Sequence, residues 1–237
     1  MTTLRRSSTL MLAIVVGAAV ARPTTAGTPA DRGPAPTLKA PTTAAAMPHA
    51  NGFITRWLLL EPIPGDGRVT DSAIQAAAKK AYFPNQLSVL PRDGDKVTVN
   101  GADYAWHAVD SSKFNVNLYH FAYFNNKPTS NVVFWGVTVI NCPQEISAVR
   151  LVFGSNAGSV WWINGREVAG IYGDRQTVID DGASKRLTLK KGPNVVRCLV
   201  VNNAGMVDFC ARFLGPDDQP LTQFTMTLGE AAIAATR

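Results

Sequence analysis

Hydrophobic residues in this chain come in short runs separated by turn-forming pairs, among them Asp93-Gly94, Asn100-Gly101, Asn164-Gly165 and Asp181-Gly182. Such pairs favour tight hairpin turns because both positions tolerate a positive φ. The runs predict strands over 53–60, 96–99, 104–108, 117–124, 132–140, 147–153, 159–163, 167–170, 186–189, 194–201, 208–214 and 223–228. So many short strands predict an all-β fold, a β-sandwich or jelly roll.

One stretch departs from this pattern. Residues 71–83 are rich in alanine, begin with Asp71 and stop before Pro84. Asp71 is a suitable N-cap and a proline ends a helix, so this stretch predicts one short helix.

The hydrophobic pattern also divides the chain into segments. Residues 1–26 combine Arg5 and Arg6 with a short apolar stretch over 10–21, which predicts a signal peptide and a secreted or periplasmic protein without a stable membrane span. Residues 27–50 are rich in Pro, Thr and Ala and predict a linker. Residues 51–228 predict the β-sandwich domain, and 229–237 a C-terminal tail.

The net charge of the chain bears on whether it binds nucleic acid. The chain has 23 Lys and Arg against 17 Asp and Glu; without Arg5, Arg6 and Arg22 of the signal peptide, 20 basic residues remain. The basic residues are scattered, so this is an ordinary soluble surface and argues against a nucleic-acid partner.

Three cysteines are present, Cys142, Cys198 and Cys210. Cys198 and Cys210 flank an expected hairpin centred near Asn203-Ala204-Gly205, so they could face each other across adjacent strands. An oxidising environment would then allow a disulfide between them. The alternative is two buried thiols that pack as small hydrophobic groups.

The C-terminal part carries a recognisable series of motifs: a loop over 154–158, a Trp162-Ile163-Asn164-Gly165 hairpin and a Leu189, Gly192, Asn194 turn. They are completed by Arg175, Asp180, Arg212 and the Asp217-Asp218-Gln219-Pro220 turn. This series resembles the galactose-binding-domain-like β-sandwich that accompanies many secreted bacterial carbohydrate-active enzymes, loosely over 51–222 and better over 146–220. The resemblance implies that fold and a carbohydrate setting. Asn156-Ala157 replaces the acidic pair of the family loop, Glu61 the usual Gly and Val207 a common aromatic residue.

Tryptophans are the candidate ligand contacts, because sugar rings stack on aromatic planes. Successive side chains of a strand face opposite ways, so Trp161 and Trp162 cannot share a face, and one ring is expected off the core. We expect Trp161 or Trp162, with Arg175 and Trp106, to line a glycan-contact surface.

A second aromatic cluster runs over 119–124. As a strand it would place Tyr119, Phe121 and Tyr123 on one face and His120, Ala122 and Phe124 on the other. Its two interpretations are the two surfaces of a sandwich strand or a ligand platform.

Catalytic motifs are missing from the sequence. It contains no Gly-x-Ser-x-Gly, His-Glu-x-x-His, Cys-x-x-Cys or phosphate loop. His107 and His120 could meet across strands and bind a metal, but their spacing is not a recognised ligand pattern. Asp174, Asp180 or Asp181 could hold a structural Ca²⁺. No catalytic or metal-binding residue is therefore assigned.

The sequence thus favours a secreted, non-catalytic module that binds a polysaccharide or other glycan. Two alternatives stay open. One is a small secreted enzyme that acts on polysaccharide, of glycosidase or lyase type. The other is a structural sandwich protein that associates with itself.

Overall fold

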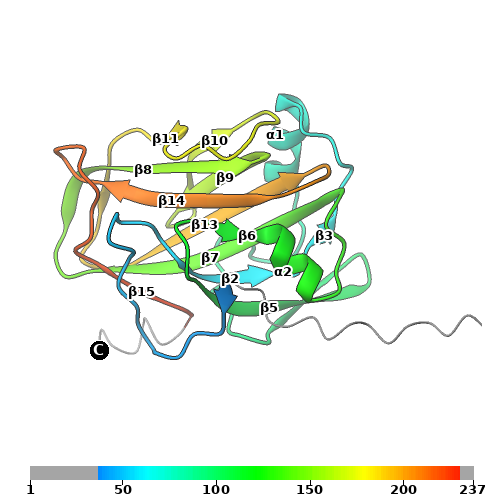
Figure 1. Ribbon diagram of the computed structural model, residues 1–237, viewed down its shortest axis with the longest axis horizontal. Helices are drawn as coiled ribbons and strands as arrows, with labels where there is room; N and C mark the ends of the chain where they lie inside the picture. Colours follow the sequence, from blue (N-terminus) through cyan, green and yellow to red (C-terminus); the bar gives the residue numbers. More distant parts are fainter. Residues whose placement is uncertain (1–36, 230–237) are drawn as a thin grey trace, which may run out of the picture. The chain divides into compact units, whose positions relative to one another are not determined.

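The strands pair into two antiparallel sheets, which confirms the predicted all-β class (Figure 1). The computed structural model describes residues 37–229, which belong to the unit Gly33–Arg237. The predicted signal peptide and nearly all of the predicted tail lie outside the described residues. No helix within 37–229 is long and apolar enough to cross a membrane.

In the described part of the chain, sheet A has ten strands and sheet B has five. Sheet A follows the order β1 (Leu38–Lys39), β5 (Ala102–Ser111), β2 (Arg56–Leu60), β7 (Val132–Cys142), β13 (Gly192–Asn202), β9 (Gly158–Ile163) and β10 (Arg166–Ile171). β3 (Ile63–Pro64) and β15 (Thr225–Thr227) pair with β7, and β4 (Lys96–Val99) pairs with β5. Sheet B follows β11 (Gly182–Ala183), β8 (Ile146–Asn156), β14 (Asp208–Leu214) and β6 (Val116–Asn117), with β12 (Leu187–Leu189) also on β8.

The first core lies between the two sheets. Trp57 of β2 and Trp161 of β9 meet Phe209 of β14 edge-on, with ring centroids 5.0 and 5.6 Å from the phenyl ring. This edge-to-face packing adds to the burial of large apolar surfaces and joins sheet A to sheet B.

A second core covers the outer face of sheet A. Helix α1 (Asp71–Lys79) and the segment that follows it pack Ile74, Tyr82 and Phe83 onto that face. Beneath them Trp162 stacks on Trp135, with ring centroids 5.5 Å apart and an interplanar angle of 22°. The central strands of sheet A are therefore buried on both faces, which explains why most of their residues are apolar.

Helix α1 forms where the sequence predicts it but is shorter. Its N-cap is Thr70, whose side chain accepts a hydrogen bond from the Ala73 amide, and Asp71 occupies the first turn. The helix ends at Lys79 rather than at residue 83. The reason is that Tyr82 and Phe83 leave the helix to pack on Trp135.

The prediction of a strand over 117–124 is wrong. This segment forms helix α2 (Leu118–Phe124) and not a strand, so residues 37–229 contain two short helices. The Asn117 side chain caps the helix by accepting from the His120 amide at 2.7 Å. Leu118, Phe121 and Ala122 anchor it to the core, and their spacing suits a helix face.

The predicted linker is partly wrong as well. Within 37–50, Leu38 is buried and β1 pairs with β5, while Ala46 pairs with Met226. Arg56 fixes the same segment by donating to the Thr43 carbonyl at 2.7 Å, while its other donors bind Asp110. Backbone pairing and the Arg56 side chain, rather than a run of large apolar residues within it, hold this segment.

The predicted disulfide is wrong in this structure, where Cys142, Cys198 and Cys210 are all free and buried. β13 and β14 do not form a hairpin. Cys198 lies on β13 in sheet A and Cys210 on β14 in sheet B, so the connection around Gly205 passes from one sheet to the other.

Candidate functional site

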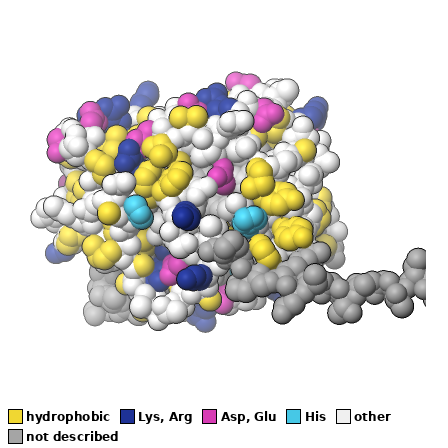
Figure 2. Space-filling model, in the orientation of Figure 1, with side chains coloured by type: hydrophobic (Ala, Val, Ile, Leu, Met, Phe, Trp, Pro, Cys, Tyr) yellow, Lys and Arg dark blue, Asp and Glu magenta, His cyan; other side chains and the backbone are white. Residues whose placement is uncertain are grey.

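Helix α2 presents a group of aromatic side chains at the surface. Tyr119 and Tyr123, one helical turn apart, stack with ring centroids 6.1 Å apart and an interplanar angle of 9°. Tyr123 is 40% exposed. Phe124 meets Tyr123 and His120 edge-on, at 5.4 and 5.8 Å. Figure 2, in the orientation of Figure 1, shows hydrophobic and histidine side chains at the surface over α2.

A groove of about 220 Å³ lies between α2 and the neighbouring strands β1 and β5. We call it the α2 groove; its lining residues are Leu38, Lys39, Ala40, His107, Ala108, Val109, His120, Phe121, Phe124 and Asn125. The ring of His107 packs edge-on against Phe121, with centroids 5.6 Å apart. The groove thus has aromatic walls with two imidazoles, an amide and an ammonium group on them.

Glu61 supports one wall from behind. Its carboxylate accepts hydrogen bonds from Lys127 Nζ at 2.9 Å and from the Ala105 amide at 3.1 Å, and lies 3.3 Å from His107 Nε2. Burial alone would raise the pKa of Glu61. The hydrogen bonds from Lys127, Ala105 and His107 outweigh it, and the pKa falls below its ordinary value of 4.5. Glu61 is therefore ionised at neutral pH and fixes the ring of His107.

The polar groups of the groove have unused hydrogen-bonding capacity. Asn125 donates through Nδ2 to the Phe121 carbonyl, which leaves its carbonyl oxygen as an acceptor. The buried Nδ1 of His120 has no hydrogen-bond partner within residues 37–229. The Asn125 acceptor beside the partly exposed ring of Tyr123 suits a ligand with apolar C–H faces and hydroxyl edges.

The structure does not assemble the site predicted around the tryptophans. Trp161, Trp162 and Trp106 are 0%, 3% and 1% exposed. Alternation does send Trp161 and Trp162 to opposite faces, but the α1 layer covers the face that was expected to be open. Trp106 lies beneath Phe83, at a centroid distance of 6.2 Å. The predicted glycan-contact role of these three rings is therefore corrected.

Arg175, the fourth predicted contact, does lie at the surface. Its guanidinium donates to Asp181 at 2.7 Å. The carboxylate of Asp180 is likewise bound by Arg212. Asp180 and Asp181, two of the three carboxylates considered as Ca²⁺ ligands, are thus paired with arginines. A structural Ca²⁺ stays a prediction.

His107 and His120, which the sequence suggested could meet, do line one groove. They are not accompanied by a third ligand: within the described part of the chain, no cluster of three His, Cys, Asp or Glu side chains could hold a metal ion. Asn125 and Lys127 gave no signal in the sequence. Glu61 stood out there solely as a departure from a family pattern.

No family model matches the chain, and no curated protein matches it. Among solved structures, a PA14 sugar-binding domain from an RTX adhesin aligns with a TM-score of 0.43 and 11% identity, over 74% of this chain and 100% of the domain. The PA14 domain of the antifreeze protein MpAFP aligns with 0.42 and 11%, over 73% and 92%. The GH31 α-xylosidase Xac1773 from Xanthomonas citri aligns with 0.30 and 9%, over 81% of this chain and 21% of the enzyme.

Proposed function

We propose that this domain is a carbohydrate-binding module and that the α2 groove is where sugar rings bind. The observation that carries the proposal is the stacked, partly exposed Tyr119–Tyr123 pair beside a groove with His107, His120 and Asn125 on its walls. Aromatic planes accept the apolar face of a sugar. The imidazole and amide groups would bind its hydroxyls and fix its orientation.

The walls of the α2 groove are held in place before any ligand binds. Asn117 caps α2, and the Glu61–Lys127 pair holds His107 from the other side. A preorganised wall loses little conformational freedom when a ligand binds.

Binding is tested on a glycan array and by polysaccharide pull-down with the full chain. Tyr123→Ala should weaken binding by about 1–3 kcal/mol, the scale of one lost aromatic contact. Phe114→Ala is the matched control, because Phe114 is 36% exposed and lies outside α2. Unchanged binding by the Tyr123 variant, or an equal loss in the Phe114 variant, would refute the assignment.

The same samples separate a binding module from an enzyme. Reducing-sugar release is followed in parallel with binding, and we expect binding without turnover. Release of reducing ends by the wild-type chain, lost in the Tyr123 variant, would make the groove an active site.

We further propose that the protein is exported, on the strength of the basic and apolar segments near its N-terminus. Mass spectrometry of the secreted protein should find a new N-terminus between about Arg22 and Thr28. Exported protein that retains Met1 would contradict this.

A further inference from the structure

A second and larger groove lies on a different part of the domain. It has a volume of about 550 Å³ and shares no lining residue with the α2 groove. We call it the basic groove; its lining residues are Ile163, Asn164, Arg166, Glu167, Val168, Lys185, Arg186, Leu187 and Thr188. β10 is the edge strand of sheet A, and β11 and β12 pair with β8 in sheet B, so the groove runs where the two sheets part.

The wall that carries Arg166 is fixed by a tethered turn. Asn164 and Gly165 have φ values of 52° and 80°, as a tight hairpin turn requires. The Asn164 side chain accepts from the Val195 amide at 2.9 Å and donates to Asn194 at 3.1 Å. The hairpin is therefore tied to β13, and the backbone of Arg166 is held at the mouth of the groove.

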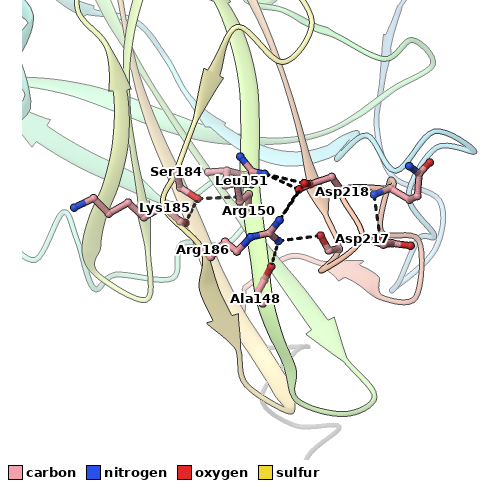
Figure 3. A network of polar contacts seen from close by, with 10 residues as sticks. Ala148, Arg150, Leu151, Ser184, Lys185, Arg186, Asp217 and Asp218 are labelled. Carbon is pink, nitrogen blue, oxygen red and sulfur yellow. Dashed lines mark hydrogen bonds and ion pairs between the residues drawn. The ribbon is translucent and has the colours of Figure 1, made fainter.

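The opposite wall is fixed by the network in Figure 3. Arg186 donates to the Ala148 carbonyl at 2.6 Å and to Asp218 at 3.0 Å, and Arg150 donates to the same carboxylate at 2.8 Å. Ser184 donates to the Lys185 carbonyl at 2.7 Å. Figure 3 shows the Lys185 side chain extending away from Asp218, so this ammonium group is not part of the network.

The two walls of the basic groove carry more positive than negative side chains. Arg150 and Arg186 share the single carboxylate of Asp218, while Arg166 and Lys185 have no ion pair within the described residues. Glu167 is the one acidic residue that lines the groove, and it accepts a hydrogen bond from the Tyr172 hydroxyl at 3.1 Å. The lining itself has three cationic side chains, Arg166, Lys185 and Arg186, and one carboxylate, Glu167, which leaves the groove with a positive potential that attracts anions.

We propose that the basic groove binds the carboxylate groups of an acidic polysaccharide, with Arg166 and Lys185 as the charged contacts. The guanidinium of Arg166 can bind a carboxylate through two parallel hydrogen bonds. The side chains of Asn164 and Thr188 offer partners for hydroxyl groups, and Ile163, Val168 and Leu187 add apolar surface. No aromatic side chain lines the groove, so it lacks the stacking planes that single-stranded nucleic acids use.

The test measures binding of the full chain to polygalacturonate and to its fully methyl-esterified form by isothermal titration. The two polymers share the sugar and differ in the carboxylate charge. We expect binding to polygalacturonate alone, weakening as salt rises. The double variant Arg166→Gln, Lys185→Gln should bind about 10- to 100-fold more weakly, because each of two solvent-exposed contacts contributes about 3- to 10-fold.

The matched control is Lys79→Gln, Lys96→Gln, which removes two positive charges from α1 and β4 and should bind within about twofold of wild type. Dextran sulfate tests for general attraction to polyanions. Equal binding of both galacturonate polymers, equal losses in both double variants, or equal affinity for dextran sulfate would overturn the proposal. Binding of neutral polysaccharides, measured on the same samples, reports on the α2 groove, so failure here is distinguishable from failure of that groove.

Discussion

At the scale of the residue, Glu61 carries the negative charge that fixes the ring of His107 in the wall of the α2 groove. It is 8% exposed, yet it is ionised because three donors surround it. Its pKa is lower in the folded than in the unfolded chain, so its contribution to stability is present above the unfolded pKa. That contribution is lost as the pH falls through the folded pKa.

Glu61→Gln should therefore make the free energy of unfolding less dependent on pH in the acid range. The free energy of unfolding of the wild type should fall between about pH 5 and pH 3 more steeply than that of the variant. Urea unfolding across this range measures both. Parallel acid limbs would show that Glu61 gains nothing from Lys127 and His107.

Trp161 and Trp162 serve two cores rather than one core and one surface. Trp161 meets Phe209 between the sheets, and Trp162 stacks on Trp135 beneath α1. Each replacement by alanine should cost about 3–5 kcal/mol of stability, because either cavity is closed on all sides. Chemical denaturation of the two variants checks this. A Trp162 variant as stable as wild type would mean that the α1 layer does not hold its ring.

The three thiols should be inert in the folded protein. Burial raises the pKa of Cys142 to about 11 and that of Cys210 to about 12, and it raises the pKa of Cys198 as well. Thiols react as thiolates, so alkylation at neutral pH should be slow before unfolding and should label three cysteines afterwards. Peptide mapping without reductant provides the count. A Cys198–Cys210 peptide pair would restore the sequence prediction.

At the scale of the element, α2 shows how a cap and three anchors override local preference. The last six of its seven residues, Tyr119 to Phe124, are mainly aromatic, a composition typical of strands. The cap at Asn117 and the buried Leu118, Phe121 and Ala122 decide for a helix. Alternation could not have revealed this, since Tyr119 and Tyr123 share a face in either structure.

Asn117→Ala should destabilise the domain by about 0.5–2 kcal/mol and loosen the Tyr119–Tyr123 pair. Asn117→Asp keeps an oxygen that can accept from the His120 amide and should stay close to wild type. Thermal unfolding and glycan affinity are measured together for both. Equal effects of the two substitutions would show that the side chain does not act as a cap.

At the scale of the whole domain, the turn pairs and apolar runs predicted the class and most strands. Asn164-Gly165 does form the turn between β9 and β10, and the expected helix does form, with Thr70 rather than Asp71 as its N-cap. The contacts between distant segments could not be predicted. The pattern of 80–92 does not show that Tyr82 and Phe83 cover Trp135, and nothing near Glu61 indicates Lys127. The galactose-binding-like topology stays a prediction.

Burial of sheet A on both faces has a consequence for hydrogen exchange. The amides of β7 and β13 are paired on both sides and covered above and below, so they should exchange with solvent solely when the whole domain unfolds. The α1 layer rests on a few side chains and should open locally and exchange sooner. In native-state exchange with increasing denaturant, α1 amides should then have opening energies well below those of β13. If the two merge at all denaturant concentrations, the layer and the sheet unfold as one unit.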